Sequence, residues 1–266
     1  MINLRTSSEM DTIATAGAII GELHDELEQK VRPGVSTGEL DHFVETFIVS
    51  HDGAVAAFKG LYGFPGSACI SVNEEVVHGI PSEQRVLAEG DIVSIDVGVR
   101  LDGWYSDSAR TFAVGVVTDE ATALMDVTRA SLEAAMAAAV PGNHVGDIGA
   151  AVVRCVDEAE GDYGIIRELV GHGVGRDLHE EPQVPNLGRP GHGPLLREGM
   201  VLAIEPMLSA GTARIKTLED GWTVITADRS LSAHFEHTVG ITKDGPRILT
   251  SAEGPVGMAT PVPGSG

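Results

Sequence analysis

The chain has 266 residues, 42% of them hydrophobic, which is enough for one large globular domain or two small ones with a substantial core. Its formal net charge of −21 argues against a general nucleic-acid-binding protein, because such a surface repels a polyanion. Two cysteines, Cys69 and Cys155, are too few for a disulfide framework or a cysteine zinc site. The N-terminal segment is polar and no apolar run is long enough to cross a bilayer, so we expect a cytoplasmic protein that does not act in a membrane.

Two helices are predicted at the start of the chain. The segments 6–9 and 36–39 each fit a capping box, in which a hydroxyl and a carboxylate bond the free N–H groups of a helix start. Apolar residues follow both segments at helical spacing, and Pro33-Gly34 separates the two helices.

The pattern then changes to strands. Residues 68–72 and 92–99 form short apolar segments rich in β-branched residues, which are typical of strands. Asp102-Gly103 predicts the turn of a hairpin whose second strand runs over 107–114. Helical and strand patterns then alternate once more, with helices expected over 118–140 and 145–159 and strands near 201–208, 222–226 and 234–241.

Short motifs recur together with this order of helix, helix and strands. Pro33-Gly34 returns as Pro141-Gly142, with an offset of 108, and each pair is followed by a glycine, an acid and an aliphatic residue. A Glu-Gly pair before Asp96 returns before Glu205 at nearly the same offset, 109. Repeats of this kind indicate an internally duplicated fold.

The fold class that follows is α+β, with helix-helix-strands halves related by a pseudo-two-fold around an antiparallel sheet. We place the halves at about 7–115 and 116–250 of a single catalytic domain, 1–250. The remaining segment, 251–266, consists mainly of Gly, Pro, Ser and Ala without a period, and this composition predicts a disordered C-terminal tail.

The repeat aligns an acid with an acid. Asp96 and Glu205 each follow an apolar run in equivalent strands, where a buried carboxylate is costly unless it is paired or binds a metal. Asp107 lies in the returning strand of the first hairpin, and Glu236 lies in a late strand of the second half. A two-fold would bring these four carboxylates together near its axis, where protons or cations must neutralise them.

Histidines complete this candidate site. His172 lies between glycines in the segment 171–175, so backbone can approach it closely. His78 and His179 both occur as His-x-x-Pro, which makes them candidate partners across the two-fold. Four carboxylates and one to three imidazoles suit a pair of divalent first-row ions, and such a pair can activate water and polarise a carbonyl. The pattern therefore predicts a hydrolytic metal site.

The other histidines receive different interpretations. His234 and His237 flank Glu236, and we interpret them as supports of the ligands rather than as ligands. The remaining ones are interpreted as surface or helix residues, and they are His24, His42, His51, His144 and His192.

Taken together, these motifs resemble those of the methionine aminopeptidases of the pita-bread fold, over about residues 7–250. The resemblance is to the short, type I form, because the spacing between His179 and Glu236 leaves no room for a helical insertion. The segments that carry it are 69–74 with 77–81, 91–98 with Asp107, 171–175 with 179–182, 204–206, and 235–238.

The resemblance implies two divalent metal ions. Manganese, iron, cobalt and zinc are all compatible with this ligand set. Asp107 and Glu236 would bridge the two ions, and Glu205 would also act as the general base in hydroxide attack on the first peptide carbonyl. The five implied ligands are Asp96, Asp107, His172, Glu205 and Glu236.

The implied reaction is removal of the N-terminal methionine from nascent proteins, with a preference for a small second residue. His179 would hydrogen-bond the substrate carbonyl, and His78 would contact the scissile amide near the leaving nitrogen. The resemblance also implies a monomer that acts near the ribosome, and a monovalent cation near Asn73 and Ser232, as in some relatives.

The methionine pocket implied by the resemblance departs from the family pattern at several positions. Cys69 and Trp222 match it, whereas Phe64 replaces a tyrosine. The residues that stand where bacterial relatives often carry cysteine, tyrosine and phenylalanine are Phe58, Leu61 and Leu178. All are apolar, as an unbranched thioether side chain requires.

Two alternatives stay open at this point. A proline-specific peptidase of the same fold, such as an Xaa-Pro aminopeptidase or prolidase, would have a longer chain with a separate N-terminal domain. A metal-free relative would serve as a binding module, and such relatives lose metal ligands and often gain basic segments, whereas this chain keeps the five ligand positions and is acidic.

Overall fold

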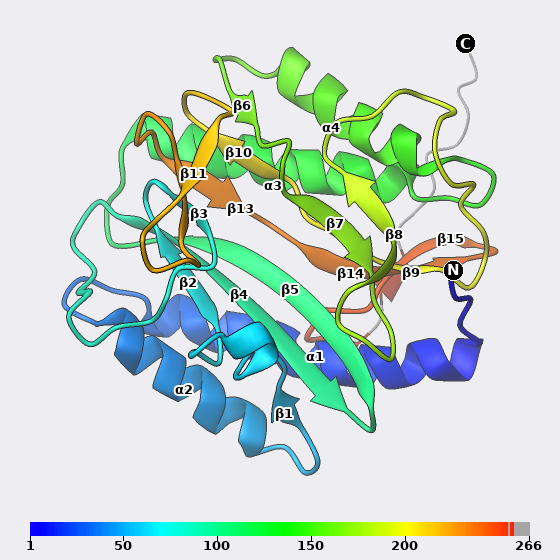
Figure 1. The fold of residues 1–266 in the computed structure, drawn as a ribbon, viewed down its shortest axis with the longest axis horizontal. Coiled ribbons are helices and arrows are strands. Elements are labelled where there is room, and N and C mark those ends of the chain that lie inside the picture. Colours follow the sequence, from blue (N-terminus) through cyan, green and yellow to red (C-terminus); the bar gives the residue numbers. More distant parts are fainter. Residues whose placement is uncertain (255, 258–266) are drawn as a thin grey trace.

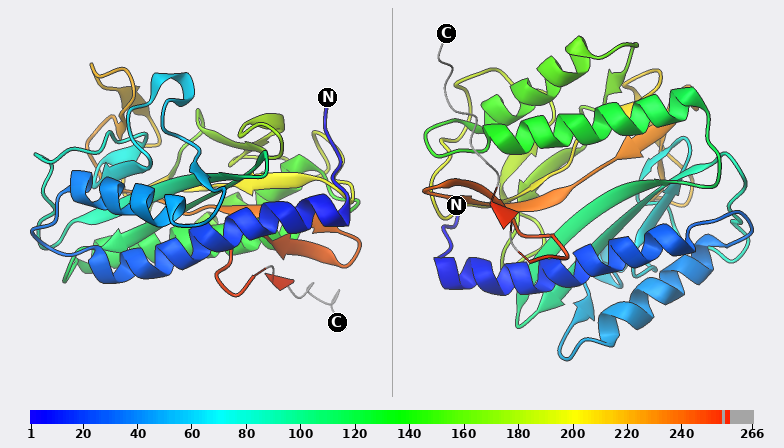
Figure 2. Two further views of the ribbon diagram at one scale, coloured as in Figure 1. Left: turned by 90° about the horizontal axis from the view of Figure 1, so that it is seen from below. Right: turned by 180° about the vertical axis from the view of Figure 1, so that it is seen from behind.

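The computed structural model describes residues 1–254 together with 256 and 257. Two halves lie side by side, and each contributes a pair of helices and a set of antiparallel strands (Figure 1). Seen from below and from behind, the long helices cover one face of the strands and leave the opposite face to loops (Figure 2). The predicted α+β class with two similar halves is therefore confirmed.

The first two helices begin where their capping boxes predict. Helices α1 (Ser7–Lys30) and α2 (Thr37–Val49) start directly after Thr6 and Ser36. In both, the capping hydroxyl accepts a bond from the third helical N–H, and the carboxylate of that third residue accepts a bond from the cap N–H.

The second pair of helices repeats this arrangement. Helix α3 (Asp119–Ala138) is capped by Thr118, and α4 (Val145–Glu158) follows it. Asp147 accepts a hydrogen bond of 2.7 Å from the N–H of His144, in the same position of α4 that the equivalent glutamate occupies in α2. The recurring motif in the sequence therefore marks the start of the second helix in each half.

A long hairpin dominates the first half. Strands β4 (Ile92–Leu101) and β5 (Trp104–Ala113) pair over their whole length around the predicted turn at Asp102-Gly103. Strands β1 (Val55–Ala56) and β2 (Cys69–Val72) pair with β4 as well. The second half contains a six-stranded sheet and two three-stranded sheets, one of which includes a strand from the first half.

The strands of these sheets are short. The six-stranded sheet consists of β16 (Val256–Gly257), β15 (Gly245–Ile248), β14 (His237–Thr242), β9 (Val201–Ile204), β7 (Val170–Gly173) and β8 (Glu180–Pro185). The two smaller sheets are β13 (Ser232–His234), β10 (Met207–Ser209) and β6 (Gly164–Ile165), and β11 (Ile215–Thr217), β12 (Val224–Thr226) and β3 (Glu75–Val77).

Two strands expected to be continuous are broken at an acidic residue. The segment 201–208 is interrupted at Glu205-Pro206, and 234–241 is interrupted at Phe235-Glu236. Pro206 has no N–H to donate, so the chain leaves the β9 ladder there and enters a different sheet as β10. Both acids consequently lie at a crossing between sheets, where their side chains are free to face a common centre.

Side-chain hydroxyls join the two halves. Thr111 of β5 accepts the N–H of His234 at 2.9 Å and donates to its carbonyl oxygen at 2.8 Å. Thr238 of β14 makes the same pair of bonds to the backbone of Asp107, at 3.0 and 2.7 Å. All four residues are buried, so these bonds fix the two halves in register along the pseudo-two-fold.

The structure describes part of the segment predicted to be a disordered tail, namely residues 251–254, 256 and 257. Ser251 and Ala252 lie against α1, where Gly21 leaves room for them, since a Cβ there would lie 2.3 Å from the backbone nitrogen of Ala252. Strand β16 then pairs with β15. The other residues of the predicted tail, 255 and 258–266, lie outside the described part of the chain.

Each half has an apolar core of its own. Ile20 and Leu27 of α1 share one cluster with Ile95 of β4, and the second half has a separate cluster that includes Leu124 of α3 and Leu202 of β9. Among the described residues, no helix combines the length and the apolar character that crossing a bilayer requires.

Candidate active site

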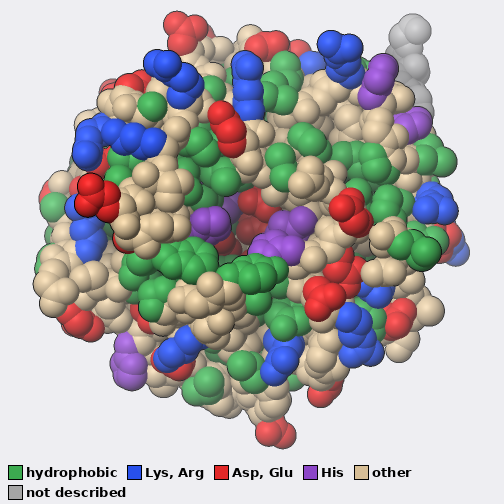
Figure 3. All heavy atoms as spheres, in the orientation of Figure 1, with side chains coloured by type: hydrophobic (Ala, Val, Ile, Leu, Met, Phe, Trp, Pro, Cys, Tyr) green, Lys and Arg blue, Asp and Glu red, His purple; other side chains and the backbone are tan. Residues whose placement is uncertain are grey.

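A cavity of about 590 Å³ opens on the face that the helices leave free. Figure 3 shows acidic and histidine side chains gathered in this hollow, with hydrophobic side chains at its border. Every site residue predicted from the sequence lines the cavity, namely Phe58, Leu61, Phe64, Cys69, His78, Asp96, Asp107, His172, Leu178, His179, Glu205, Trp222 and Glu236.

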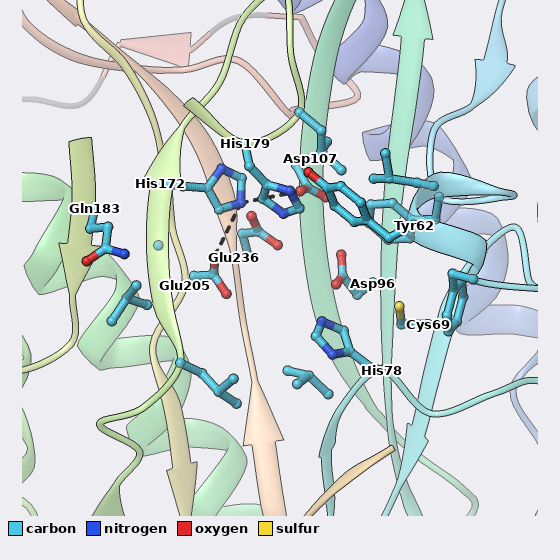
Figure 4. Close-up of a pocket in the computed structure, with 18 of the residues that line it drawn as sticks. Tyr62, Cys69, His78, Asp96, Asp107, His172, His179, Gln183, Glu205 and Glu236 are labelled. Atoms are coloured by element: carbon cyan, nitrogen blue, oxygen red, sulfur yellow. Dashed lines mark ion pairs between the residues drawn. The ribbon is translucent and has the colours of Figure 1, made fainter. Parts of the chain in front are cut away.

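Strand register brings the four carboxylates together. Asp96 pairs with Ala109 in the β4-β5 hairpin, so Asp107, two residues earlier on β5, is its diagonal neighbour on the same face. The N–H of Glu236 donates to the carbonyl oxygen of Ala109 at 2.9 Å, which holds Glu236 against the same strand. Glu205 follows the end of β9, and the four side chains point toward one another in Figure 4.

His172 faces this cluster from strand β7. Its Nε2 lies 3.8 Å from Oδ2 of Asp107 and 3.5 Å from Oε1 of Glu205, as the dashed lines in Figure 4 mark. Its Nδ1 donates to the carbonyl oxygen of Gly173 at 2.9 Å. Because that bond places the proton on Nδ1, the lone pair of Nε2 is directed at the carboxylates, as a metal-ligating imidazole requires.

The glycines on either side of His172 are needed because the neighbouring strands lie very close to β7. A Cβ at position 171 would lie 2.3 Å from the carbonyl oxygen of Ala203, and one at position 173 would lie 2.4 Å from that of Glu181. Strand β7 can therefore fit between β8 and β9 only with glycine at both positions, as the Gly-His-Gly motif predicts.

The donor set fits divalent ions. Three carboxylate oxygens, Oδ1 of Asp96, Oδ1 of Asp107 and Oε1 of Glu236, are buried without a hydrogen-bond partner among the described residues. One ligand atom from each of Asp107, His172 and Glu236 lies within 4.8 Å of the others. Buried oxygens in such a group need a cation or protons, because unpaired charge in a protein interior is costly.

The electrostatics of the cluster agree with this. Burial, followed by repulsion from the neighbouring carboxylates, raises the pKa of Asp96, Glu205 and Glu236 well above the usual range. Burial raises the pKa of Asp107 to about 7 and lowers that of His172 to about 4. The imidazole is therefore neutral at physiological pH and able to bind a metal ion.

His78 and His179 come from different halves and both line the cavity. His179 is exposed at the rim, and its ring centroid lies 4.4 Å from that of His172. His78 has a left-handed backbone (φ 59°) and its ring lies 6.3 Å from that of Trp222. Polar hydrogen-bonding groups thus border the carboxylate cluster on two sides.

An apolar pocket adjoins the cluster. Phe58, Phe64, Cys69 and Leu178 form a buried apolar group, and Leu61 and Trp222 pack against it. Cys69 is paired with Asp96 in the β2-β4 register, so this pocket begins directly beside a carboxylate. Burial raises the pKa of the Cys69 thiol well above its usual range, so the pocket remains uncharged on this side.

Sequence reasoning missed Tyr62 at the rim. Its side chain is 77% exposed, and its ring is nearly parallel to that of His179, at 6.2 Å and 16°. Tyr62 lies in a short 3₁₀ turn (Leu61–Gly63) with a left-handed φ of 51°, a local conformation that no spacing in the sequence marks. His237, interpreted as a support, bonds Thr250 instead, at 2.8 Å.

Comparison with known proteins gives consistent matches. The family model of metallopeptidase family M24 matches residues 11–243. The methionine aminopeptidase of Clostridium perfringens is 53% identical over 250 residues, which cover 94% of this chain and 99% of that protein. The crystal structure of methionine aminopeptidase from Rickettsia prowazekii has a TM-score of 0.91 at 41% identity, covering 94% of this chain and 100% of the other. The prolidase from Pyrococcus furiosus has a TM-score of 0.73 at 25% identity, covering 93% of this chain but 65% of its own.

Proposed function

The chain belongs to metallopeptidase family M24, and we propose that it removes the N-terminal methionine from nascent polypeptides. The observation that supports this substrate is the apolar pocket beside Asp96, whose lining suits a flexible thioether side chain. The similarity to a methionine aminopeptidase over nearly the whole of both chains also favours it over a prolidase, of which this chain matches 65%.

The metal centre is part of this proposal. Two divalent ions held by the cluster would polarise the scissile carbonyl and lower the pKa of the attacking water. The residues that would hold them are Asp96, Asp107, His172, Glu205 and Glu236. Manganese, iron, cobalt and zinc are all compatible with carboxylate and imidazole ligands.

The chain's own side chains transfer the proton, bind the substrate and hydrogen-bond the developing negative charge. Glu205 takes a proton from the attacking water and passes it to the leaving amine. His179, at the rim, donates a hydrogen bond to the oxygen of the scissile carbonyl as negative charge develops on it. His78 contacts the leaving nitrogen, and the pocket that includes Cys69 and Trp222 holds the methionine side chain.

Methionine release from the peptide Met-Ala-Ser tests the proposed function. Metal-stripped protein should release none, and addition of Mn²⁺ or Co²⁺ should start the reaction. Xaa-Pro peptides, assayed in parallel, should stay intact, and their cleavage in place of Met-Ala-Ser would indicate a prolidase. Folded protein that cleaves neither substrate with any metal would point to a binding module.

A preference for a small second residue is expected of this site. Tyr62 and His179 stack at the rim of the cavity, where they would narrow the space for the second residue of a bound peptide. We expect kcat/KM for Met-Ala-Ser to exceed that for Met-Leu-Ser by at least about 10-fold, the discrimination that steric exclusion of a few methylenes gives. Equal values for the two peptides would contradict this preference.

The outline of the methionine pocket depends on Gly98. A Cβ at this position would lie 2.6 Å from Cε1 of Phe58 and 2.9 Å from Cβ of Ala57. Gly98→Ala should push the Phe58 ring into the pocket and raise KM for Met-Ala-Ser by about 10-fold, equivalent to about 1.4 kcal/mol of lost binding. Replacing the ring by the smaller leucine side chain, in a Gly98→Ala, Phe58→Leu double variant, should recover part of this loss. If KM is not recovered, the effect of Gly98→Ala does not come from displacement of Phe58.

Further features of the proposal rest on the family resemblance. They are a monovalent cation near Asn73 and Ser232, a monomeric protein, and action in the cytoplasm on chains that emerge from the ribosome. In the structure, the N–H of Ser232 donates to the carbonyl oxygen of Asn73 at 2.8 Å, so these two residues are in contact. The dependence of activity on K⁺ or Na⁺ tests the cation, and sedimentation tests the monomer.

A further inference from the structure

Glu205 lies between two imidazoles. Nε2 of His172 is 3.5 Å from its Oε1, and Nε2 of His234 is 3.6 Å from its Oε2. The first contact belongs to the predicted metal cluster and is drawn in Figure 4. The second gives the other carboxylate oxygen a partner that the proposed reaction does not use.

Strand register produces the contact with His234. Strands β10 and β13 are antiparallel, with Met207 opposite His234, and Glu205, two residues before Met207 in the chain, lies close to His234. The backbone of His234 is held in place by Thr111, which bonds both its N–H and its carbonyl oxygen, and Thr111 is bonded in turn to Ser94 at 2.8 Å. The imidazole therefore projects from a rigid support that includes both halves.

The position of the ring decides what His234 can act on. Its side chain is 2% exposed, and Nε2 is buried without a hydrogen-bond partner among the described residues. Glu205 and His172 line the cavity, whereas His234 does not. A substrate in the cavity would therefore meet Glu205 and not His234, and any effect of His234 on the reaction has to pass through the carboxylate.

We propose that His234 is a positioning residue for Glu205, in which Nε2–H donates to Oε2 and keeps Oε1 directed at His172 and the centre of the cluster. A movement of a few tenths of an ångström turns the present contact into a hydrogen bond. Bonds of this kind are often long in unliganded active sites and shorten when substrate is bound. The inference rests on the proposed function insofar as Glu205 is the base of that reaction.

A carboxylate held at one oxygen has a fixed orientation at the other. Without the donor, Glu205 can rotate about its last torsion, which broadens the distribution of the oxygen that takes the proton from water. Residues that orient a metal ligand or base in this way typically contribute about 10–100-fold to activity or metal affinity. Substrate binding should change little, because the methionine pocket is formed by other residues.

Three variants test the proposal on the full chain. His234→Leu removes the donor, and His234→Gln keeps an N–H donor. His24→Leu is the control, because His24 is also a buried histidine whose Nε2 has no partner among the described residues, but it lies outside the site. We would measure kcat and KM on Met-Ala-Ser, the visible absorption of the Co²⁺-loaded protein, which reports the ligand geometry, and thermal stability. His234→Leu should lower kcat by about 10–100-fold with unchanged KM and an altered Co²⁺ spectrum.

The expected pattern is specific to positioning. His234→Gln should restore kcat and the Co²⁺ spectrum, and His24→Leu should resemble the wild type in both. The proposal would be overturned if His234→Leu had the kcat and the Co²⁺ spectrum of the wild type. It would also be overturned if both His234 variants lost kcat equally and in proportion to their loss of thermal stability. If the wild type releases no methionine, the proposed function fails. In that case, a Co²⁺ spectrum that is altered in His234→Leu and restored in His234→Gln would still support the His234–Glu205 contact. A spectrum that is unaltered in His234→Leu would refute this contact.

Discussion

Glu205→Gln should abolish methionine release while leaving the protein folded. Glutamine has nearly the same shape, but it cannot accept the proton of the attacking water, and it is a weaker metal ligand than a carboxylate. Loss of a general base costs about 10²–10⁴-fold in kcat, and loss of a metal ligand adds to this. The measurement is kcat on Met-Ala-Ser at saturating Mn²⁺ or Co²⁺, together with the metal content of the variant.

Glu75→Gln is the matched control. Glu75 is also a partly buried glutamate whose pKa burial raises, but its carboxylate accepts the N–H of Val72 at 2.7 Å and does not line the cavity. A glutamine oxygen can accept the same bond, so activity should remain close to that of the wild type. An active Glu205→Gln variant would remove Glu205 from the chemistry and leave the base to another carboxylate of the cluster.

That these acidic residues gather in one cavity could be predicted from the sequence, because the internal repeat contains long-range information. The repeat by itself aligns Asp96 with Glu205, and the buried character of both strands makes an isolated carboxylate improbable there. The helix starts could be predicted because capping is local, within four residues of Thr6 or Ser36. In the structure Asp96 and Glu205 line the same cavity, and both helices begin directly after their capping residues.

Other features could not be predicted because they depend on register between strands that are far apart. Glu205 and His234 are close only because β10 and β13 pair with Met207 opposite His234, and neither strand specifies its partner by composition. The short strands β7 and β8 gave no strand pattern, since the glycines of β7 and Pro182 and Pro185 of β8 are not typical strand residues. Tyr62 was missed for a different reason, namely that its own backbone is left-handed although it is not a glycine.

The similarity to a prolidase indicates that the fold alone does not determine which substrate the site accepts. The prolidase shares the fold at a TM-score of 0.73, so the fold does not by itself select methionine. In the proposed function the methionine side chain is selected by the apolar group around Cys69 and Trp222, which is built largely from the loop before β2 and the residues before β12. Changes in these segments can alter the substrate without disturbing the strands that hold the carboxylates.

Without metal, the protein should be less stable at pH 8 than at pH 6. Burial raises the pKa of Asp107 from 3.8 to about 7, so the folded state binds this proton more tightly than the unfolded chain does. The resulting stability is complete below the unfolded pKa and is lost as the pH rises through about 7. The pKa values of Asp96, Glu205 and Glu236 are raised as well, so these groups act in the same direction. Mn²⁺ should raise Tm most at pH 8, where it replaces the missing protons.

Asp107→Asn separates this effect from the overall charge of −21, which also destabilises a compact state as pH rises. Because asparagine carries no charge, the metal-free variant should melt at a higher temperature than the metal-free wild type at pH 8, by about 2–4 °C for each kcal/mol of relieved repulsion. The same variant should lose most of the stabilisation by Mn²⁺. Asp162→Asn, on an exposed loop, removes one charge outside the cluster and should change neither quantity. If Asp107→Asn lowers the metal-free Tm at pH 8, the carboxylate must have a stabilising partner other than a metal ion, and the cluster would then be structural.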